Sequence, residues 1–211
     1  GADTGWTHPF IQDDWSNAPD WSLTEDNPWW GLLRKLLRLV AADAPGRYLV
    51  CTPDLGGSGD ILLNLRGATG LCTDVITQPQ RIRAALDAIY PAWQRAFTEL
   101  YRAVLDGGAG IVHWLGLWSN RPYVIPACDF NFMIAPEHFS NLFLPDIARQ
   151  AASVGRAVFH LDGPGAARHI DALLEVPEIH AIQFTPGEGT PSALAWVDMF
   201  KRIQAKGRSV L

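Results

Sequence analysis

Residues 158–165 read V-F-H-L-D-G-P-G, and this stretch decides the fold that we predict for the chain. A short apolar run ends in His160, Asp162 and a Gly-Pro-Gly turn, and a helical pattern begins directly afterwards. This order is typical of a strand, loop and helix in a parallel α/β protein, whose strands point their carboxyl ends at the ligand. We therefore expect an imidazole and a carboxylate at a ligand site, the alternative being that both only satisfy loop hydrogen bonds.

The same alternation of strand and helix recurs along the chain. Repeated units with apolar strands predict a parallel sheet covered by helices. The sequence suggests about five strands, whereas a closed (β/α)₈ barrel has eight strands and roughly 250 residues. The expected fold class is therefore α/β, a (β/α)₈ TIM-barrel type that is incomplete. The expected strands are 47–52, 109–115, 157–161, 181–185 and a last one that opens at 208, with a further short extended piece at 123–127.

Two regions differ in composition. Residues 1–27 are rich in Trp, Asp and Pro without a sustained period, so we expect an irregular arm whose tryptophans pack on the body. Residues 28–211 carry the periodic pattern and form the expected partial-barrel domain. Asn27 and Pro28 begin its first helix as a cap and first-turn pair, and Pro91 is expected to kink or divide the long helix near 79–106.

Composition excludes several classes of protein. The net charge is −5 and no basic cluster is visible, which argues against a nucleic-acid surface. No apolar run reaches the roughly 18 residues that span a bilayer, and the first residues lack the pattern of a signal peptide. The 3 cysteines are widely separated, which favours free thiols in a reducing compartment, and we expect a cytoplasmic protein.

Polar residues recur where the expected strands end. In a parallel sheet all of them lie at one edge, where they can form a site for a small-molecule ligand. We expect catalytic roles for His160, Asp162 and Asp129. Ligand-binding roles are expected for Asp54, His113, Trp114, Gln183 and Glu188.

Two kinds of chemistry fit this set. Imidazole and carboxylate groups can hold a divalent metal such as zinc, with His160 and Asp162 as the first ligands. Acid–base chemistry without a metal is equally open, because a neighbouring carboxylate raises the pKa of an imidazole and orients its proton. Other groups are expected to be structural, since the glycines at 56–59 lack the lysine of a P-loop and read as a flexible turn. His8, His138 and His169 are expected at the surface or as caps.

Over residues 48–211 the chain resembles the uroporphyrinogen decarboxylase superfamily, which includes the corrinoid-dependent methyltransferases. Four stretches carry the resemblance. They are D-I-L-L-N-L-R-G at 60–67, D-G-G-A-G-I-V-H-W at 106–114, D-F-N-F-M-I-A-P-E-H-F-S-N-L-F-L-P-D-I at 129–147, and F-H-L-D-G at 159–163 with A-I-Q-F-T-P-G at 181–187.

The resemblance implies decarboxylase or methyltransferase chemistry on a small molecule at the strand ends. The methyltransferase branch binds zinc partly through His-x-Cys at the position of 160–162, where this chain has Asp162 in place of the cysteine. Relative to the family, the first two strands and the closing strand are missing, so we expect a homo-oligomer or the arm to cover open sheet edges. The alternatives are a non-catalytic module that binds a tetrapyrrole, corrinoid or sugar, and a truncated inactive fragment.

Overall fold

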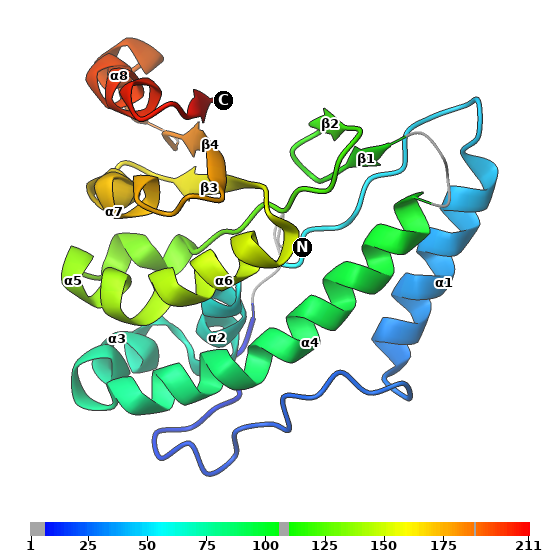
Figure 1. Cartoon of the computed structure of the whole chain (residues 1–211). Coiled ribbons are helices and arrows are strands. Elements are labelled where there is room, and N and C mark those ends of the chain that lie inside the picture. Colours follow the sequence, from blue (N-terminus) through cyan, green and yellow to red (C-terminus); the bar gives the residue numbers. More distant parts are fainter. Residues whose placement is uncertain (1–6, 106–109, 188) are drawn as a thin grey trace.

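The structure is a computed structural model that describes residues 7–105, 110–187 and 189–211. Figure 1 shows the carboxyl-terminal strands with α7 and α8 at one end of the molecule, and the long helix α4 with α1 at the other. The α-helices are α1 (Pro28–Asp43), α2 (Ser58–Arg66), α3 (Ala68–Thr77), α4 (Pro79–Leu105), α5 (Pro136–His138), α6 (Leu144–Val154), α7 (Ile170–Leu174) and α8 (Val197–Ala205). Short 3₁₀ segments lie at Asp129–Met133, Ala166–His169 and Ala193–Trp196, and a π turn at Phe139–Phe143 joins α5 to α6.

The described residues form two small sheets. β1 (Ile111–Val112) pairs antiparallel with β2 (Trp118–Ser119). β3 (Ala157–Asp162), β4 (Ile179–Thr185) and β5 (Ser209–Val210) form a parallel sheet in that order. Single parallel bridges join Cys51 to Val112, Val124 to Ala157 and Ala127 to His160. The chain is α/β, but the expected incomplete TIM barrel with about five parallel strands is wrong, because only three described strands form a parallel sheet.

The sequence explains why the other segments do not form a regular ladder. Pro122 and Pro126 flank the extended piece near 123–127, and proline has no N–H to donate to a neighbouring strand. Gly116 has a φ of 72°, which only glycine adopts readily, and it lies in the turn that leads β1 back into β2. The chain therefore makes single bridges at these places where continuous parallel strands were expected.

The two faces of the parallel sheet differ. Along β3, Ala157, Phe159 and Leu161 are buried, while the alternate residues are only partly buried. Buried Phe159 and Leu161 belong to the main apolar cluster, which also includes residues of α4, α6 and α7. The other face carries His160 and Asp162, opposite Gln183 and Thr185 of β4. One face of the sheet is thus a core layer, and the other presents polar groups.

Helix α4 is the longest of the described helices, with 27 residues. It continues through Pro91 from Pro79 to Leu105, so the proline does not divide it. One side contributes Ile82, Leu86, Ile89 and Trp93 to the main cluster. Near its carboxyl end a second cluster joins it to α1, with the buried side chains Trp30, Leu37, Ala41, Ala96, Leu100 and Val104.

The described part of the arm, residues 7–27, has no helix or strand and runs along the lower side of the molecule in Figure 1. A buried ion pair holds it, because Arg66 Nε lies 2.6 Å from Asp74 Oδ2. Trp15 donates its indole N–H to the same carboxylate at 3.0 Å. Arg66 also donates to the backbone oxygen of Ile11 at 3.3 Å. The arm is therefore fastened to α2 and α3 at this buried charge pair, and the backbone N–H groups of Phe10 and Ile11 add hydrogen bonds to the carbonyl oxygen of Leu65, both at 2.7 Å.

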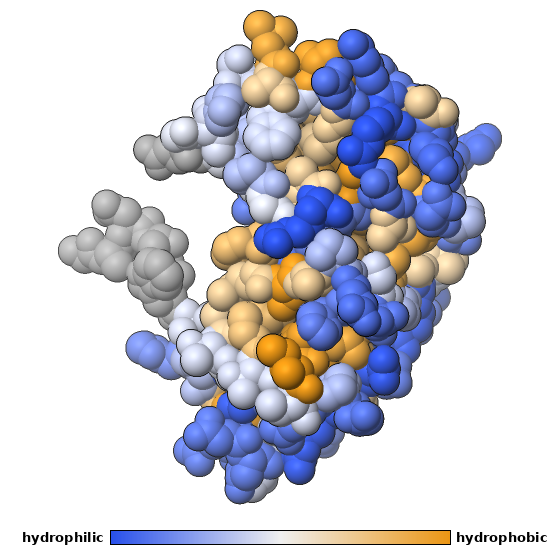
Figure 2. Space-filling model, turned by 90° about the vertical axis from the view of Figure 1, so that its left-hand side faces the viewer, coloured by the Kyte–Doolittle hydropathy of each residue, from blue (hydrophilic) through white to orange (hydrophobic). Residues whose placement is uncertain are grey.

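Exposed apolar side chains are spread over the surface. Figure 2 shows the face that carries α3, α5, α7 and α8, on which apolar patches lie between hydrophilic side chains.

Across the described part of the chain, no helix combines the length and the hydropathy that crossing a bilayer would require.

Candidate functional site

His160 lies at the centre of the polar face of the sheet. Its Nδ1 is hydrogen-bonded to the side-chain oxygen Oε1 of Gln183, the residue directly opposite on β4. The amide nitrogen of Gln183 in turn donates to Thr185 Oγ1 at 2.9 Å. Because an amide oxygen can only accept, Nδ1 carries the proton and Nε2 is left as the basic nitrogen of the neutral ring.

Asp129 lies close enough to His160, Asp162 and Asp54 for their charges to act on it. Partial loss of hydration raises the pKa of Asp129, the charge of His160 opposes that rise, and the carboxylates of Asp162 and Asp54 add to it. These residues come from three separate segments, namely the ends of β3, of the extended piece near 127, and of the segment near 51. We call His160, Gln183, Asp129, Asp162, Asp54 and Trp114 the strand-end site.

Asp60 lies close enough to Asp129 of the strand-end site for their charges to interact. Asp60 was not among the site residues predicted from the sequence. Burial, followed by repulsion from Asp129, raises the pKa of its carboxyl to about 7. The backbone N–H of Phe130 donates to its Oδ1 at 3.4 Å. Asp60 stands three residues after Gly57, the N-cap of α2. This position was the available signal in the sequence, because carboxylates are favoured in the first turn of a helix.

The glycines at 56–59 hold α2 against the site. A Cβ on Gly57 would lie 2.0 Å from the backbone oxygen of Ala127, and one on Gly59 would lie 3.0 Å from Cys128 Sγ. Only glycine allows this close approach. The role expected for these glycines, a flexible turn, is thus replaced by a packing role that brings Asp60 next to Asp129.

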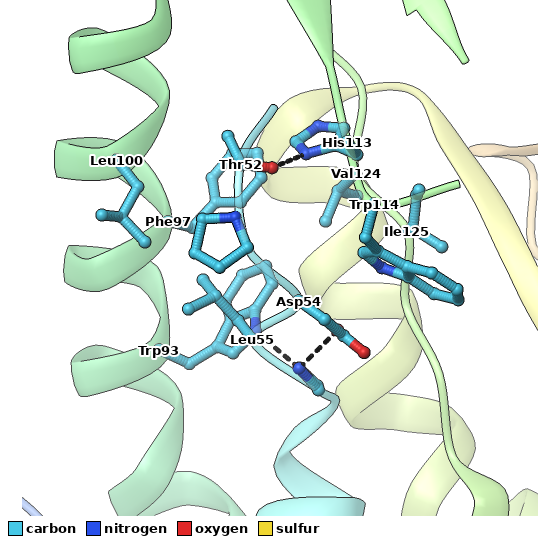
Figure 3. Close-up of a pocket in the computed structure, with 12 residues that line it drawn as sticks. Thr52, Asp54, Leu55, Trp93, Phe97, Leu100, His113, Trp114, Val124 and Ile125 are labelled. Carbon is cyan, nitrogen blue, oxygen red and sulfur yellow. Dashed lines mark hydrogen bonds between the residues drawn. The ribbon is translucent and has the colours of Figure 1, made fainter. Parts of the chain in front are cut away.

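A small cavity of about 30 Å³ opens beside the site between α4 and the segments that carry Asp54 and His113. Figure 3 shows Trp93, Phe97 and Leu100 of α4 on one side of it. Asp54 and Trp114 lie on the other side in the same view. The cavity is apolar on the helix side and has polar groups on the side of the strand ends.

His113 holds the fold together and offers no free nitrogen. Nε2 lies 2.7 Å from the backbone oxygen of Tyr123, and Nδ1 is hydrogen-bonded to Thr52 Oγ1. Since the carbonyl can only accept, Nε2 carries the proton and Nδ1 accepts from the threonine hydroxyl. Burial lowers the pKa of this histidine, which favours the neutral ring. The ligand-binding role expected for His113 is thus indirect, because its ring fixes the cavity wall.

Trp114 connects the cavity to His160. The two rings meet edge to face, with centroids 5.0 Å apart and planes at 83°. Trp114 therefore helps to orient the imidazole and, with Asp54, lines the cavity beside it. Glu188, the remaining expected ligand-binding residue, lies outside the described residues.

The zinc implied by the resemblance does not fit the groups present. Within the described ranges, no three His, Cys, Asp or Glu side chains come together in a way that could hold a metal ion. His160 and Asp162 lie on one face of β3, but Nδ1 of His160 is already bonded to Gln183. Two donors from one strand leave a zinc ion short of the three or four protein ligands that it normally has.

Comparison of the chain with protein-family models, with curated proteins and with solved structures finds no match. The resemblance to the uroporphyrinogen decarboxylase superfamily therefore stays a prediction from the four sequence stretches. The geometry of the strand-end site carries the functional argument that follows.

Proposed function

We propose that the chain binds a small molecule at the strand-end site and that His160 transfers a proton in a decarboxylation of that molecule. One observation carries the proposal. The imidazole is fixed by Gln183 through Nδ1 and contacted by Trp114, so Nε2 is held in place, and Asp129 is close enough for the charge of His160 to act on it. A positioned imidazole is the most common general acid and base in enzymes, and it typically contributes about 10²- to 10⁴-fold to the rate.

In this reaction the bond between the carboxyl group and its carbon breaks, and CO₂ leaves the electron pair on that carbon. The imidazolium form of His160 donates the Nε2 proton to the carbon, and water restores the proton afterwards. Asp129 supports binding, because its carboxyl group, whose pKa is raised by burial, can in its acid form donate a hydrogen bond to the substrate carboxylate. The residues thus divide into a proton donor and a group that orients the substrate.

The charges around the site favour a substrate with a single carboxylate. Asp54 and Asp162 are close enough to Asp129 for their negative charges to raise its pKa, whereas the charge of the imidazolium form of His160 lowers it. A ligand with many carboxylates would be repelled by this arrangement. Methyl transfer through a zinc-bound thiolate is disfavoured for a different reason, since the strand carries Asp162 where that chemistry needs sulfur.

A second candidate is a binding module without catalysis. The aromatic residues Trp93, Phe97 and Trp114 around the small cavity favour it, because aromatic rings bind planar or sugar-like ligands by stacking. In that case His160 would act only as a hydrogen-bonding group for the ligand.

Incubation with small carboxylic acids in D₂O distinguishes these functions, with acetoacetate and pyrrole-3-acetate as the first probes. The proposal expects a product that carries deuterium at the carbon that lost CO₂. His160→Asn should lower the rate by about 100-fold. His180→Asn is the matched control, because His180 is an exposed histidine of the same sheet that is bonded only to the backbone of Glu178. Binding of a probe without turnover would support the binding module.

A further inference from the structure

Helix α1 presents an apolar face to the outside of the molecule. Its inner side packs on α4 through Trp30, Leu37 and Ala41. Trp29 on the outer side is 78% exposed and Leu39 is 59% exposed. With 100° per residue, the exposed apolar side chains fall within one arc of the helix. They are Trp29, Leu32, Leu36, Leu39 and Val40, and we call them the α1 face.

Such a surface is unusual for a single helix. Isolated exposed apolar residues are normal, but a contiguous patch of large ones marks a place where another molecule binds. In Figure 1, α1 lies at the edge of the molecule, with α4 on its inner side. The α1 face is separate from the strand-end site, and an occupant there would not obstruct it.

Basic residues border the α1 face on one side. Lys35 and Arg38 are exposed and line a shallow groove on the helix surface together with Gly31, Arg34 and Leu39. Arg34 is paired with Glu25 and Glu99, whereas Lys35 and Arg38 form no ion pair with any residue that the structure describes. Two cations without partners therefore lie along one edge of an apolar stripe, on a chain whose net charge is −5.

We propose that the α1 face binds an amphipathic helix of another protein, with apolar residues along one stripe and acidic residues beside it. Apolar residues at helical spacing would pack between Leu32, Leu36 and Leu39, as in helix-in-groove recognition. Acidic side chains along the flank would pair with Lys35 and Arg38.

The same charges disfavour two other occupants. In an antiparallel pair of α1 helices centred on Leu36, Lys35 of one copy would lie across from Arg38 of the other, and like charges would repel. An anionic membrane would attract the two cations but repel a chain with a net charge of −5. An amphipathic helix with acidic residues beside its apolar stripe can pack on the apolar side chains of the α1 face and pair with Lys35 and Arg38.

Fluorescence anisotropy with designed peptides tests this proposal on the whole chain. The probe is a labelled 18-residue amphipathic helix with a Leu stripe flanked by Glu, and the controls carry Lys in place of Glu or the same residues in scrambled order. We expect the Glu peptide to bind at least 10-fold more tightly than either control. The double variant Lys35→Glu, Arg38→Glu should reverse the preference between the Glu and Lys peptides.

The variant Leu36→Ser should weaken binding of the Glu peptide by about 10-fold, because it removes one exposed apolar contact without touching the core. Circular dichroism checks that each variant is folded. Equal binding of the peptides would overturn the proposal. So would a concentration-dependent dimer abolished by Leu36→Ser, or binding to vesicles of phosphatidylcholine and phosphatidylserine that exceeds binding of the peptide.

Discussion

His160 donates its Nδ1–H to the side-chain oxygen of Gln183, the residue directly opposite it in the parallel sheet. This pair sets the tautomer of the imidazole and leaves Nε2 as the nitrogen that can take and give a proton. The amide nitrogen of Gln183 donates to Thr185 Oγ1, which holds the other end of the amide in place. The chemistry that we propose depends on this relationship between two neighbouring strands.

Replacing Gln183 by Leu removes the acceptor and keeps the size of the side chain. We expect the rate with the carboxylic acid probes to fall by about 10- to 100-fold, because the ring can then adopt either tautomer and orientation. The pH dependence of the rate is the second readout. A change in proton transfer at the imidazole moves the midpoint of the rate profile, whereas a loss of folded protein lowers the rate without moving that midpoint. Thr185→Val is the control, and we expect it to lower the rate less, because it keeps the hydrogen bond between His160 and Gln183. An unchanged rate in Gln183→Leu would count against the role given to His160 and Gln183.

Asp60 makes stability depend on pH. Its pKa is about 7 in the folded chain, and an exposed Asp has a pKa of about 3.9. Between these values the folded state binds a proton that the unfolded state has lost, so stability falls as pH rises from about 4 to 7 and is level above that range. Asp60→Asn should therefore gain stability relative to the wild type as pH rises, as measured by urea unfolding at pH 5 and pH 8. An equal difference at both pH values would contradict this account.

The buried pair of Arg66 and Asp74 should be essential to the arm. Removing one partner of a buried ion pair costs about 3–5 kcal/mol, because the other charge is left without compensation. Asp74→Ala is thus expected to lower the free energy of unfolding by that amount and to expose Trp15, as seen by its fluorescence and by proteolysis of the arm. Asp13→Ala provides the comparison, since the Asp13 side chain is fully exposed and lies 3.6 Å from Arg66. Similar losses in both variants would argue against the assigned role.

Replacing Gly57 or Gly31 by alanine should change the stability of the protein in opposite directions. Gly57→Ala places a methyl group 2.0 Å from the backbone oxygen of Ala127, so α2 must shift and stability falls. Gly31→Ala has nothing within 4 Å and lies inside α1, where it should stabilise the helix by about 0.5–1 kcal/mol. Thermal unfolding measures both, and a tolerated alanine at position 57 would show that the close contact is not required.

Much of the helical pattern and the strand around His160 could be predicted from the sequence. The observed β3 at Ala157–Asp162 matches the expected strand at 157–161, because a short apolar run that ends at a Gly-Pro-Gly turn is a strong local signal. The sheet as a whole could not be predicted. Whether the segments near 51 and 124 form strands depends on pairing with distant neighbours, and the prolines at 122 and 126 interrupt that pairing.

The proximity of some of the expected site residues could be predicted for the same reason, whereas their roles stay predictions. The sequence identified His160, Gln183 and Asp129, which the fold brings near one another, because they follow predicted strand ends. It could not reveal that both nitrogens of His113 are used inside the fold. It also placed His169 at the surface or as a cap, whereas the structure buries it with Nε2 at 2.8 Å from the backbone oxygen of Asn131. Such contacts join residues tens of positions apart and leave no local pattern.

The central claim is that Nε2 of His160 is the free, basic nitrogen of the strand-end site. Long-range ¹H–¹⁵N NMR of the histidine side chains tests this directly, with the resonances assigned by loss of the signal in His160→Asn. At a pH where the ring is neutral, we predict a protonated Nδ1 and an unprotonated Nε2 that shifts when pyrrole-3-acetate is added. A neutral ring that carries its proton on Nε2 would contradict the account.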